Sequence, residues 1–315
     1  MNGKILISVE SLTYFYDDNC AIDDLSFKVK RGEVLGFLGP NGAGKSTTMQ
    51  MITGNIAPSA GGVTINGIDL LSEPKRAKAE LGYLPEQPPL YRELTVDEYL
   101  RYCAKLNRIA RVEIETAINR AKTRCGLVDV GSRLIGNLSK GYQQRVGIAQ
   151  AIIHNPAVVI LDEPTVGLDP IQIREIRQLI RELGNEHGVI LSTHILPEVQ
   201  ATCSRVQIIH QGKLLFSDTM DGLDARLSEP VLRLKLSNPP PLEMLTALPG
   251  IESAERSDAG YIELRHSPET NPAGAVAEAA VVNGWGVLAL TPHRKSLEQI
   301  FVELTTGATG EEPAA

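Results

Sequence analysis

The chain has 315 residues, enough for about two domains, and its 43% hydrophobic content can fill a sizeable core. Its net charge of −7 argues against a broad nucleic-acid-binding surface, because neutralising phosphates requires concentrated basic side chains. No stretch of about 18 residues is uninterruptedly apolar, so no membrane-spanning helix is predicted. We expect a cytoplasmic chain with reduced thiols, because the first residues lack a signal peptide's apolar run and the 4 cysteines form no C-x-x-C pair.

The first part of the chain contains two runs in which apolar and polar residues alternate. They cover about residues 4–16 and 20–33, and the turn-forming sequence Asp17-Asp-Asn19 separates them. Alternation with a period of two is typical of strands with one buried face. The sequence therefore predicts a pair of half-exposed strands before residue 34.

A phosphate-binding loop is predicted directly after the apolar strand Val34 to Leu38. The sequence there follows the pattern G-x-x-x-x-G-K-[ST], in which glycines let several backbone N–H groups approach phosphate oxygens closely. Lys45 supplies a positive charge for the phosphates, and Ser46 a hydroxyl for Mg²⁺. The alternative is a glycine-rich turn between a strand and a helix. The candidate nucleotide-binding residues are Gly39, Asn41, Gly42, Ala43, Gly44, Lys45, Ser46 and Thr47.

Tyr16, at the end of the first strand, is a candidate for the base of the nucleotide. An aromatic ring can stack on adenine, which needs little more than a flat apolar surface. Packing within the strands would explain the same residue equally well.

Beyond the loop we expect a strand at Val63–Ile65 with a turn at Asn66-Gly67, then a short charged helix over about residues 73–80. A strand at Gly82–Pro85 places Glu86 and Gln87 at the sheet edge where ligands collect. Thr95-Val-Asp-Glu98 has the pattern of a helix capping box. Its helix has a predicted apolar face that consists of Val96, Tyr99, Leu100 and Leu106. We predict a separate helical lobe over about residues 88–155.

The next helix begins at Ser139, and its predicted inward face consists of Tyr142, Val146, Ala149 and Ile153. Serine is a good N-cap, which alone would explain its presence. A helix N-terminus with a serine hydroxyl and a glycine backbone is also a ready anion site.

Ala157 to Leu161 is apolar at every position, as in a central parallel strand covered on both faces. It ends at Asp162 and Glu163. Asp162 can hold Mg²⁺ or its water, and Glu163 can orient or deprotonate an attacking water. A solvated strand end is the alternative. A later apolar strand, Val189–Leu191, brings His194 to the same edge, where it is either a γ-phosphate sensor or a structural residue.

The order of these features resembles the nucleotide-binding subunits of the ATP-binding cassette (ABC) transporter family, over about Lys4 to Asp224. The resemblance implies a P-loop NTPase fold of the ABC type, an α/β structure with an antiparallel β subdomain and a helical lobe. It also implies a head-to-tail dimer around two ATP molecules with Mg²⁺. In each site Ser139, Lys140, Gly141 and Tyr142 of one subunit would face the phosphate loop of the other. Glu163 and His194 would support hydrolysis, and Asp169 would lie at the dimer seam.

Three positions depart from the family's usual pattern. Glu86 stands where glutamine is common, with Gln87 one place later, so either residue is a candidate for sensing the metal. Lys140 replaces a glycine and Tyr142 a glutamine in the signature sequence. Ser139 and Gly141, which hold phosphate in the family, are present.

The C-terminal part carries a β-α-β-β-α-β-α pattern from Val231 to Leu304, which suggests a small ferredoxin-like α+β domain. We therefore expect a nucleotide-binding domain at residues 1–226, an accessory domain at 227–306 and a disordered tail at 307–315. Similar C-terminal additions that end in a Leu-Glu-x-Ile-Phe helix occur on ABC exporter ATPases.

We interpret the chain as the ATP-hydrolysing subunit of an exporter. Its expected partners are a separate transmembrane permease and a second copy of itself or another cassette, with no nucleic acid, and its expected location is the cytoplasmic face of the cell membrane. Tyr91, Leu94, Tyr99 and Tyr102 are the hypothetical surface for the permease. The alternative is a soluble or regulatory ABC-type ATPase that is not coupled to transport.

Overall fold

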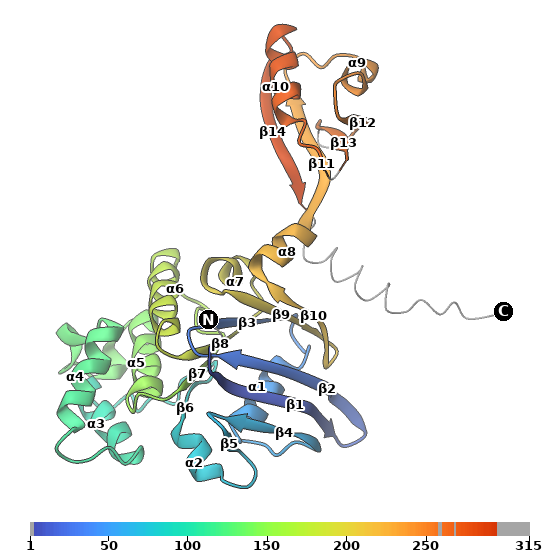
Figure 1. Ribbon diagram of the computed structural model, residues 1–315. Coiled ribbons are helices and arrows are strands. Elements are labelled where there is room, and N and C mark those ends of the chain that lie inside the picture. Colours follow the sequence, from blue (N-terminus) through green and yellow to red (C-terminus); the bar gives the residue numbers. More distant parts are fainter. Residues whose placement is uncertain (1–2, 258–259, 268, 295–315) are drawn as a thin grey trace. The chain divides into compact units, whose positions relative to one another are not determined.

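The computed structural model describes residues 3–257, 260–267 and 269–294 (Figure 1). The chain divides into two compact units between Met220 and Asp221. The boundary expected at residues 226/227 lies near the end of helix α8 (Met220–Leu227), whose residues from Asp221 onward belong to the second unit.

The first unit is built on a six-stranded sheet with the order β10-β9-β3-β8-β7-β6 (Figure 1). Neighbouring strands are parallel, except that β10 runs antiparallel to β9. All five residues of β7 are buried, which matches its continuous apolar sequence. The strands are β3 (Val34–Leu38), β6 (Leu81–Leu84), β7 (Val158–Asp162), β8 (Gly188–Thr193), β9 (Arg205–His210) and β10 (Lys213–Thr219).

The two faces of this sheet contribute to two separate hydrophobic cores. Val158 and Ile160 of β7 belong to one core, which also contains residues of helix α1 (Lys45–Ile52) and of a second sheet. Val159 and Leu161 belong to the other, which contains residues of α6 (Pro170–Gly184) and of the helical lobe. Successive strand residues point to opposite faces, so each strand is fixed from both sides and its carboxyl end is held in place.

The second sheet is antiparallel, with the order β2-β1-β4-β5, and confirms the predicted antiparallel β subdomain. Asn66 and Gly67 both have positive φ angles, 50° and 83°, and form the turn between β4 and β5. Helix α2 (Pro74–Ala79) lies at the expected place. The strands are β1 (Ile5–Tyr16), β2 (Asn19–Lys30), β4 (Ala60–Ile65) and β5 (Ile68–Asp69).

The helical lobe contains α3 (Val96–Leu106), α4 (Ile114–Cys125) and α5 (Lys140–Ile152), with short 3₁₀ turns at Val128–Val130 and Ile135–Asn137. The predicted capping box at Thr95 and Glu98 is formed. Two predictions for inward-facing side chains are wrong: Leu106 is 62% exposed at the end of α3, and Tyr142 is 40% exposed in the first turn of α5. None of the helices in the described ranges is both long and apolar enough to span a bilayer.

The second unit has one antiparallel sheet with the order β12-β13-β11-β14. Its elements follow the predicted β-α-β-β-α-β order, with Trp285 and Leu264 among the side chains of its core. The helix predicted at Leu297–Leu304 and the tail at 307–315 lie outside the described residues. The elements are β11 (Ser228–Leu236), α9 (Leu242–Thr246), β12 (Ile251–Arg256), β13 (Ile262–His266), α10 (Ala273–Val282) and β14 (Val287–Arg294).

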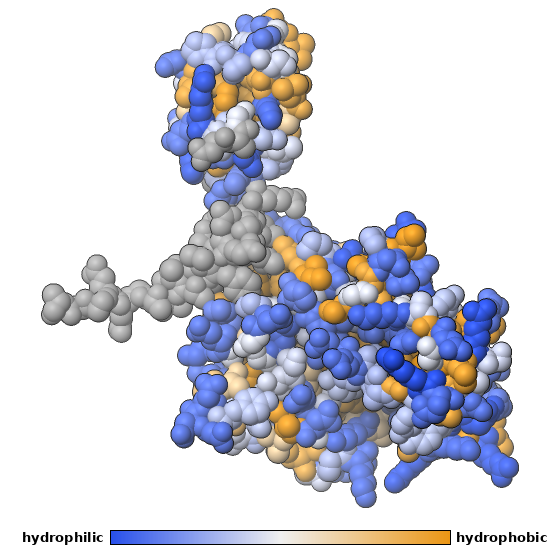
Figure 2. All heavy atoms as spheres, turned by 180° about the vertical axis from the view of Figure 1, so that it is seen from behind, coloured by the Kyte–Doolittle hydropathy of each residue, from blue (hydrophilic) through white to orange (hydrophobic). Residues whose placement is uncertain are grey.

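Apolar side chains also lie on the surface of the second unit, where Figure 2 shows broad hydrophobic areas. The most exposed are Val281 and Val282, at 76% and 77%, at the end of α10. Leu288 of β14 is 62% exposed. Such neighbouring exposed apolar residues are more typical of a contact surface than of a fully solvated one.

Candidate functional site

A large cavity of about 920 Å³ lies at the carboxyl ends of the parallel strands. The cavity therefore lies at the edge of the sheet where a ligand is expected. The cavity brings together residues from six segments that are distant in sequence. Its lining comprises Tyr16, Asn19, Cys20, Ala21, Asp23, Asn41, Gly42, Gly44, Lys45, Ser46, Thr47, Glu86, Glu163, Val166, His194, Gln211, Gly212 and Lys213.

The loop between β3 and α1 adopts a backbone conformation that requires glycine at two positions. Gly44 has a φ of 103°, in a region that other residues rarely adopt. Gly39 is needed for another reason, because a Cβ atom there would lie 2.5 Å from the carbonyl oxygen of Ile209. Ala43, also predicted to bind nucleotide, is buried and does not line the cavity.

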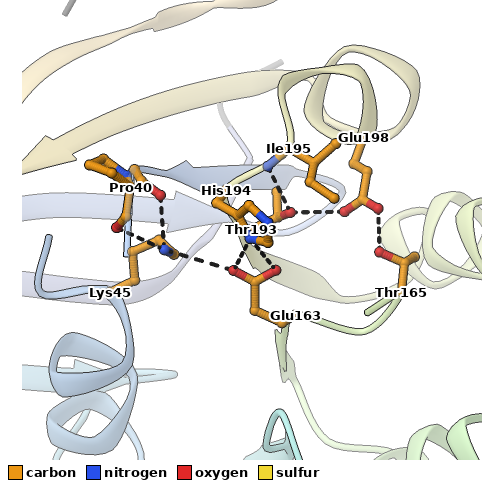
Figure 3. A network of polar contacts seen from close by, with 9 residues as sticks. Pro40, Lys45, Glu163, Thr165, Thr193, His194, Ile195 and Glu198 are labelled. Atoms are coloured by element: carbon orange, nitrogen blue, oxygen red, sulfur yellow. Dashed lines mark hydrogen bonds and ion pairs between the residues drawn. The ribbon is translucent and has the colours of Figure 1, made fainter. Parts of the chain in front are cut away.

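Lys45 is 6% exposed, and its ammonium group is fully engaged. Its Nζ donates to the carbonyl oxygens of Gly39 at 2.8 Å and Pro40 at 3.2 Å, and lies 3.8 Å from Oε1 of Glu163 (Figure 3). Burial lowers the pKa of Lys45, and the negative charge of Glu163 opposes this shift. The loop thus holds the positively charged ammonium group of Lys45 beside the cavity, where it can bind an anionic ligand.

Asp162, the last residue of β7, has an unpaired buried oxygen. The residue is 3% exposed, and Oδ1 has no hydrogen-bond partner among the residues that the structure describes. Burial raises the pKa of Asp162, and the nearby carboxylates of Glu163 and Glu86 act in the same direction. A divalent cation would relieve both the missing partner and the crowded negative charge, so the residues present fit Mg²⁺.

Glu163 and His194 form a direct contact at the edge of the cavity (Figure 3). Nδ1 of His194 lies 2.9 Å and 3.1 Å from the two carboxylate oxygens of Glu163. Glu163 has a φ of 48°, and its backbone N–H donates to the carbonyl of Ser192 at 2.9 Å. The structure therefore joins two residues that the sequence places 31 positions apart.

Glu86 and Gln87, the two candidates for the metal, differ in whether they line the large cavity. Glu86 lines the large cavity together with Ser46 and Glu163. Gln87 lines a neighbouring cavity of about 530 Å³, which Glu86 also borders. The geometry favours Glu86 as the residue on the phosphate side.

The predicted signature residues lie away from the phosphate loop of their own chain. Ser139, Gly141 and Tyr142 line a cavity of about 260 Å³ that shares no residue with the large one. The hydroxyl of Ser139 accepts from the backbone N–H of Tyr142 at 3.4 Å and caps α5. Lys140 borders the cavity that contains Gln87. One chain alone therefore does not bring Ser139 to Lys45.

Two further predicted residues occupy distinct positions. Asp169 caps helix α6, because its Oδ1 accepts from the N–H groups of Ile171 at 3.0 Å and Gln172 at 2.9 Å. Tyr16 is 47% exposed at the rim of the large cavity, with its ring edge-on to that of Tyr14 at 4.8 Å. Its exposed face leaves room for a stacked base.

Comparison with known proteins agrees with this geometry. A family profile described as "ABC transporter" matches residues 22–166. The chain is 37% identical to the bacitracin transport ATP-binding protein BcrA of Bacillus licheniformis, over 96% of this chain and 98% of that protein. The chain belongs to the ABC transporter family. It is an ATP-binding subunit, and such subunits hydrolyse ATP.

Other ABC proteins are similar over different parts of the chain. The linearmycin resistance ATP-binding protein LnrL of Bacillus subtilis is 31% identical over 95% of this chain and 98% of its own length. A solved ATP-binding subunit of an ABC transporter has a TM-score of 0.64 and 34% identity, over 70% of this chain and 92% of that one. CbiO1 of Clostridium perfringens is part of the ABC transporter complex cbiONQ. It has a TM-score of 0.65 and 29% identity, over 70% of this chain and 90% of its own.

Two walls of the cavity in this ABC subunit were not predicted from the sequence: the first residues of β2, and the turn that follows β9. The turn between β9 and β10 contributes Gln211 and Gly212, and the N–H of Gly212 donates to the carbonyl of Ala43 at 3.0 Å. The turn thereby supports the phosphate loop from β9 and β10, the two strands on one side of β3 in the sheet. In the sequence, the pair Gln211-Gly212 stands between two alternating segments and so predicts a hairpin. It does not predict that this hairpin contacts the phosphate loop.

Proposed function

We propose that two copies of this chain bind two ATP molecules head to tail, and that ATP hydrolysis drives export through a separate membrane permease. The observation that carries the proposal is the separation of Ser139 and Gly141 from Lys45, in cavities without a common residue. A second copy, turned head to tail, would supply the missing helix N-terminus to each phosphate loop.

The phosphate grip would come from the loop after β3. Lys45 would exchange its contacts with two backbone carbonyls for contacts with phosphate oxygens, because a phosphate oxygen carries a negative charge and a carbonyl oxygen does not. Ser46 and Asp162, with Glu86, would hold Mg²⁺. When bound, Mg²⁺ neutralises charge on the transferred phosphoryl group. Tyr16 would stack on the adenine.

The hydrolytic step would rest on Glu163 and His194. The Glu163 carboxylate can accept a proton from the attacking water or orient it, and His194 holds this carboxylate by its Nδ1 atom. Asp169 stands directly before α6 and would lie at the seam between the two copies. Each site would therefore combine the chemistry of one copy with the anion-binding helix of the other.

The proposed permease partner is supported by the relatives. BcrA is named a bacitracin transport protein, and CbiO1 is part of a transporter complex. On the helical lobe Tyr91 and Tyr102 are 45% and 40% exposed, and their rings lie 5.5 Å apart. Tyr99, also expected on this surface, is buried, so that part of the expectation is wrong. We place the docking surface at Tyr91, Leu94 and Tyr102, on the cytoplasmic face of the membrane.

For the second unit we propose a ferredoxin-like accessory domain over about residues 227–306. The order β12-β13-β11-β14 places the first and third strands of the unit side by side in the centre of the sheet. Both helices connect strands of the same antiparallel sheet, as in a split β-α-β arrangement. Its apolar surface suits a role in protein contacts.

The experiment that tests the proposed function is Glu163→Gln. It keeps the side chain's size and removes one catalytic group, so we expect turnover to fall roughly a hundredfold while ATP binding persists. The matched control is Glu115→Gln, at a carboxylate that is 65% exposed on the lobe. Unchanged turnover in Glu163→Gln would refute the role of Glu163, and a wild-type dimer without ATPase activity would favour the regulatory alternative.

A further inference from the structure

Glu198, in helix α7 (Leu196–Thr202), is a buried carboxylate to which the proposed mechanism gives no role. It is 1% exposed. A buried carboxylate is costly unless hydrogen bonds or opposite charge compensate it. Its neighbours should therefore reveal why it stands there.

Three side chains compensate this carboxylate. The hydroxyl of Thr165 donates to Oε1, and the hydroxyl of Thr193 donates to Oε2 at 2.9 Å (Figure 3). The guanidinium of Arg177, from α6, lies 4.0 Å from Oε1. Both oxygens of Glu198 are thus engaged, each by a different segment of the chain.

The two threonines belong to the segments that carry the proposed hydrolytic pair. Thr165 follows Glu163 by two residues, and Thr193 directly precedes His194. Both are buried, at 3% and 0% exposure. The hydroxyl of Thr193 also accepts from the N–H of Ile195 at 3.1 Å, which fixes the backbone on both sides of His194.

The contact between Glu163 and His194 depends on these two backbones. Glu163 has a φ of 48°, a conformation that its own side chain disfavours, so neighbouring contacts must maintain it. The His194 side chain is 42% exposed, so packing alone does not hold its ring. A shift of either segment would separate Nδ1 from the carboxylate oxygens.

We propose that Glu198 is a positioning residue for ATP hydrolysis, which clamps the segment after Glu163 to the segment before His194 through Thr165 and Thr193. The proposal rests on the proposed function of the hydrolytic pair. Glu198 touches neither Lys45 nor the phosphate loop among the recorded contacts of the described residues, so the clamp acts on turnover and not on ATP binding.

Thr165→Val tests the clamp with the smallest change. Valine keeps the shape of threonine and removes the hydroxyl, and Thr165→Ser restores the hydroxyl. We expect Thr165→Val to lower kcat about tenfold with KM for ATP unchanged within about twofold, because misplacement of a reacting group costs rate more than binding. Thr165→Ser should recover kcat to within about threefold of wild type.

Helix α7, which contains Glu198, offers a matched control. Thr202 is 6% exposed, and within the described ranges its hydroxyl has no hydrogen-bond partner. Thr202→Val therefore makes the same chemical change at a similarly buried site outside the clamp, and should leave kcat unchanged. Equal losses in the Thr165→Val and Thr202→Val variants would overturn the proposal, because they would reflect packing alone.

Glu198→Gln provides a second, independent test. An amide offers one acceptor oxygen where the two hydroxyls need two, so one threonine loses its acceptor. We expect Glu198→Gln to lower kcat about tenfold in the wild-type background. If Glu198 acts through His194, the same change should lower kcat by less than about threefold in a His194→Ala background. Fully additive losses, or wild-type kcat in Glu198→Gln, would overturn the proposal.

The outcomes separate this inference from the proposed function. If Glu163→Gln abolishes turnover while Thr165→Val and Glu198→Gln hydrolyse ATP normally, the clamp is refuted and the hydrolytic pair stands. If Glu163→Gln retains full turnover, the proposed function itself is refuted.

Discussion

Gly82 of β6 lies where the strand packs most tightly on helix α5, and Gly82→Ala would place a methyl group between two backbones. The added Cβ would lie 2.1 Å from the carbonyl oxygen of Ala151 and 2.9 Å from its carbonyl carbon. Ordinary contact begins at 3.4 Å, so strand and helix must separate by about 1.3 Å. Neither side has a flexible side chain that could move away instead.

The expected cost follows from this overlap. Overpacking of a well-packed interior costs about 1–3 kcal/mol, and a clash between two backbones belongs at the upper end. For a unit of this size, 1 kcal/mol corresponds to about 2–4 °C in Tm, so Gly82→Ala should lower Tm by about 6–12 °C.

Thermal unfolding of the full chain, followed by circular dichroism, measures this shift. The matched control is Gly62→Ala in β4, where an added Cβ meets no atom within 4 Å. That variant should keep or slightly raise Tm, because alanine reduces the freedom of the unfolded chain. A Gly82→Ala variant as stable as Gly62→Ala would refute the close packing of β6 on α5.

Three further predictions concern binding, capping and pH. Lys45→Ala should weaken binding of a fluorescent ATP analogue roughly tenfold to a hundredfold, because a charge-assisted contact to phosphate is lost; unchanged affinity would contradict this. Asp169→Ala should destabilise the protein to urea by about 1 kcal/mol, whereas Asp169→Asn, which can still cap α6, should not. Burial lowers the pKa of His187 and of His154 below the usual 6.5, so the folded protein binds fewer protons than the unfolded chain in mildly acidic solution. Its Tm should therefore fall as the pH is lowered from about 7 to about 5, and a constant Tm would refute the neutral state of both imidazoles.

The sequence was most informative where a local pattern has one structural solution. The apolar run at β7 predicts a strand covered on both faces, and the strand is buried throughout. The capping box at Thr95 and Glu98 predicts the start of α3 to the residue. Strand ends followed by Lys45, Glu163 and His194 predict a common edge, because parallel strands bring their carboxyl ends together.

The sequence was less informative where burial depends on other segments. A helical period marks Tyr142 and Leu106 as inward-facing, yet both lie at helix ends that the lobe does not cover. The role of Glu198 has no local signal either, because one of its two threonine partners, Thr165, stands 33 residues earlier. Such contacts follow from the topology of the sheet, which a single sequence does not encode as a short motif.

At the left-handed position of Glu163, stability and the proposed chemistry favour different residues. Glycine would adopt a φ of 48° without steric cost, whereas a side chain there is strained. Selection for stability alone would favour glycine after Asp162, whereas the proposed ATP hydrolysis needs the carboxylate. Under the proposed mechanism the strained main chain at this position is kept because Glu163 accepts a proton, so a glycine here would raise thermal resistance at the expense of turnover.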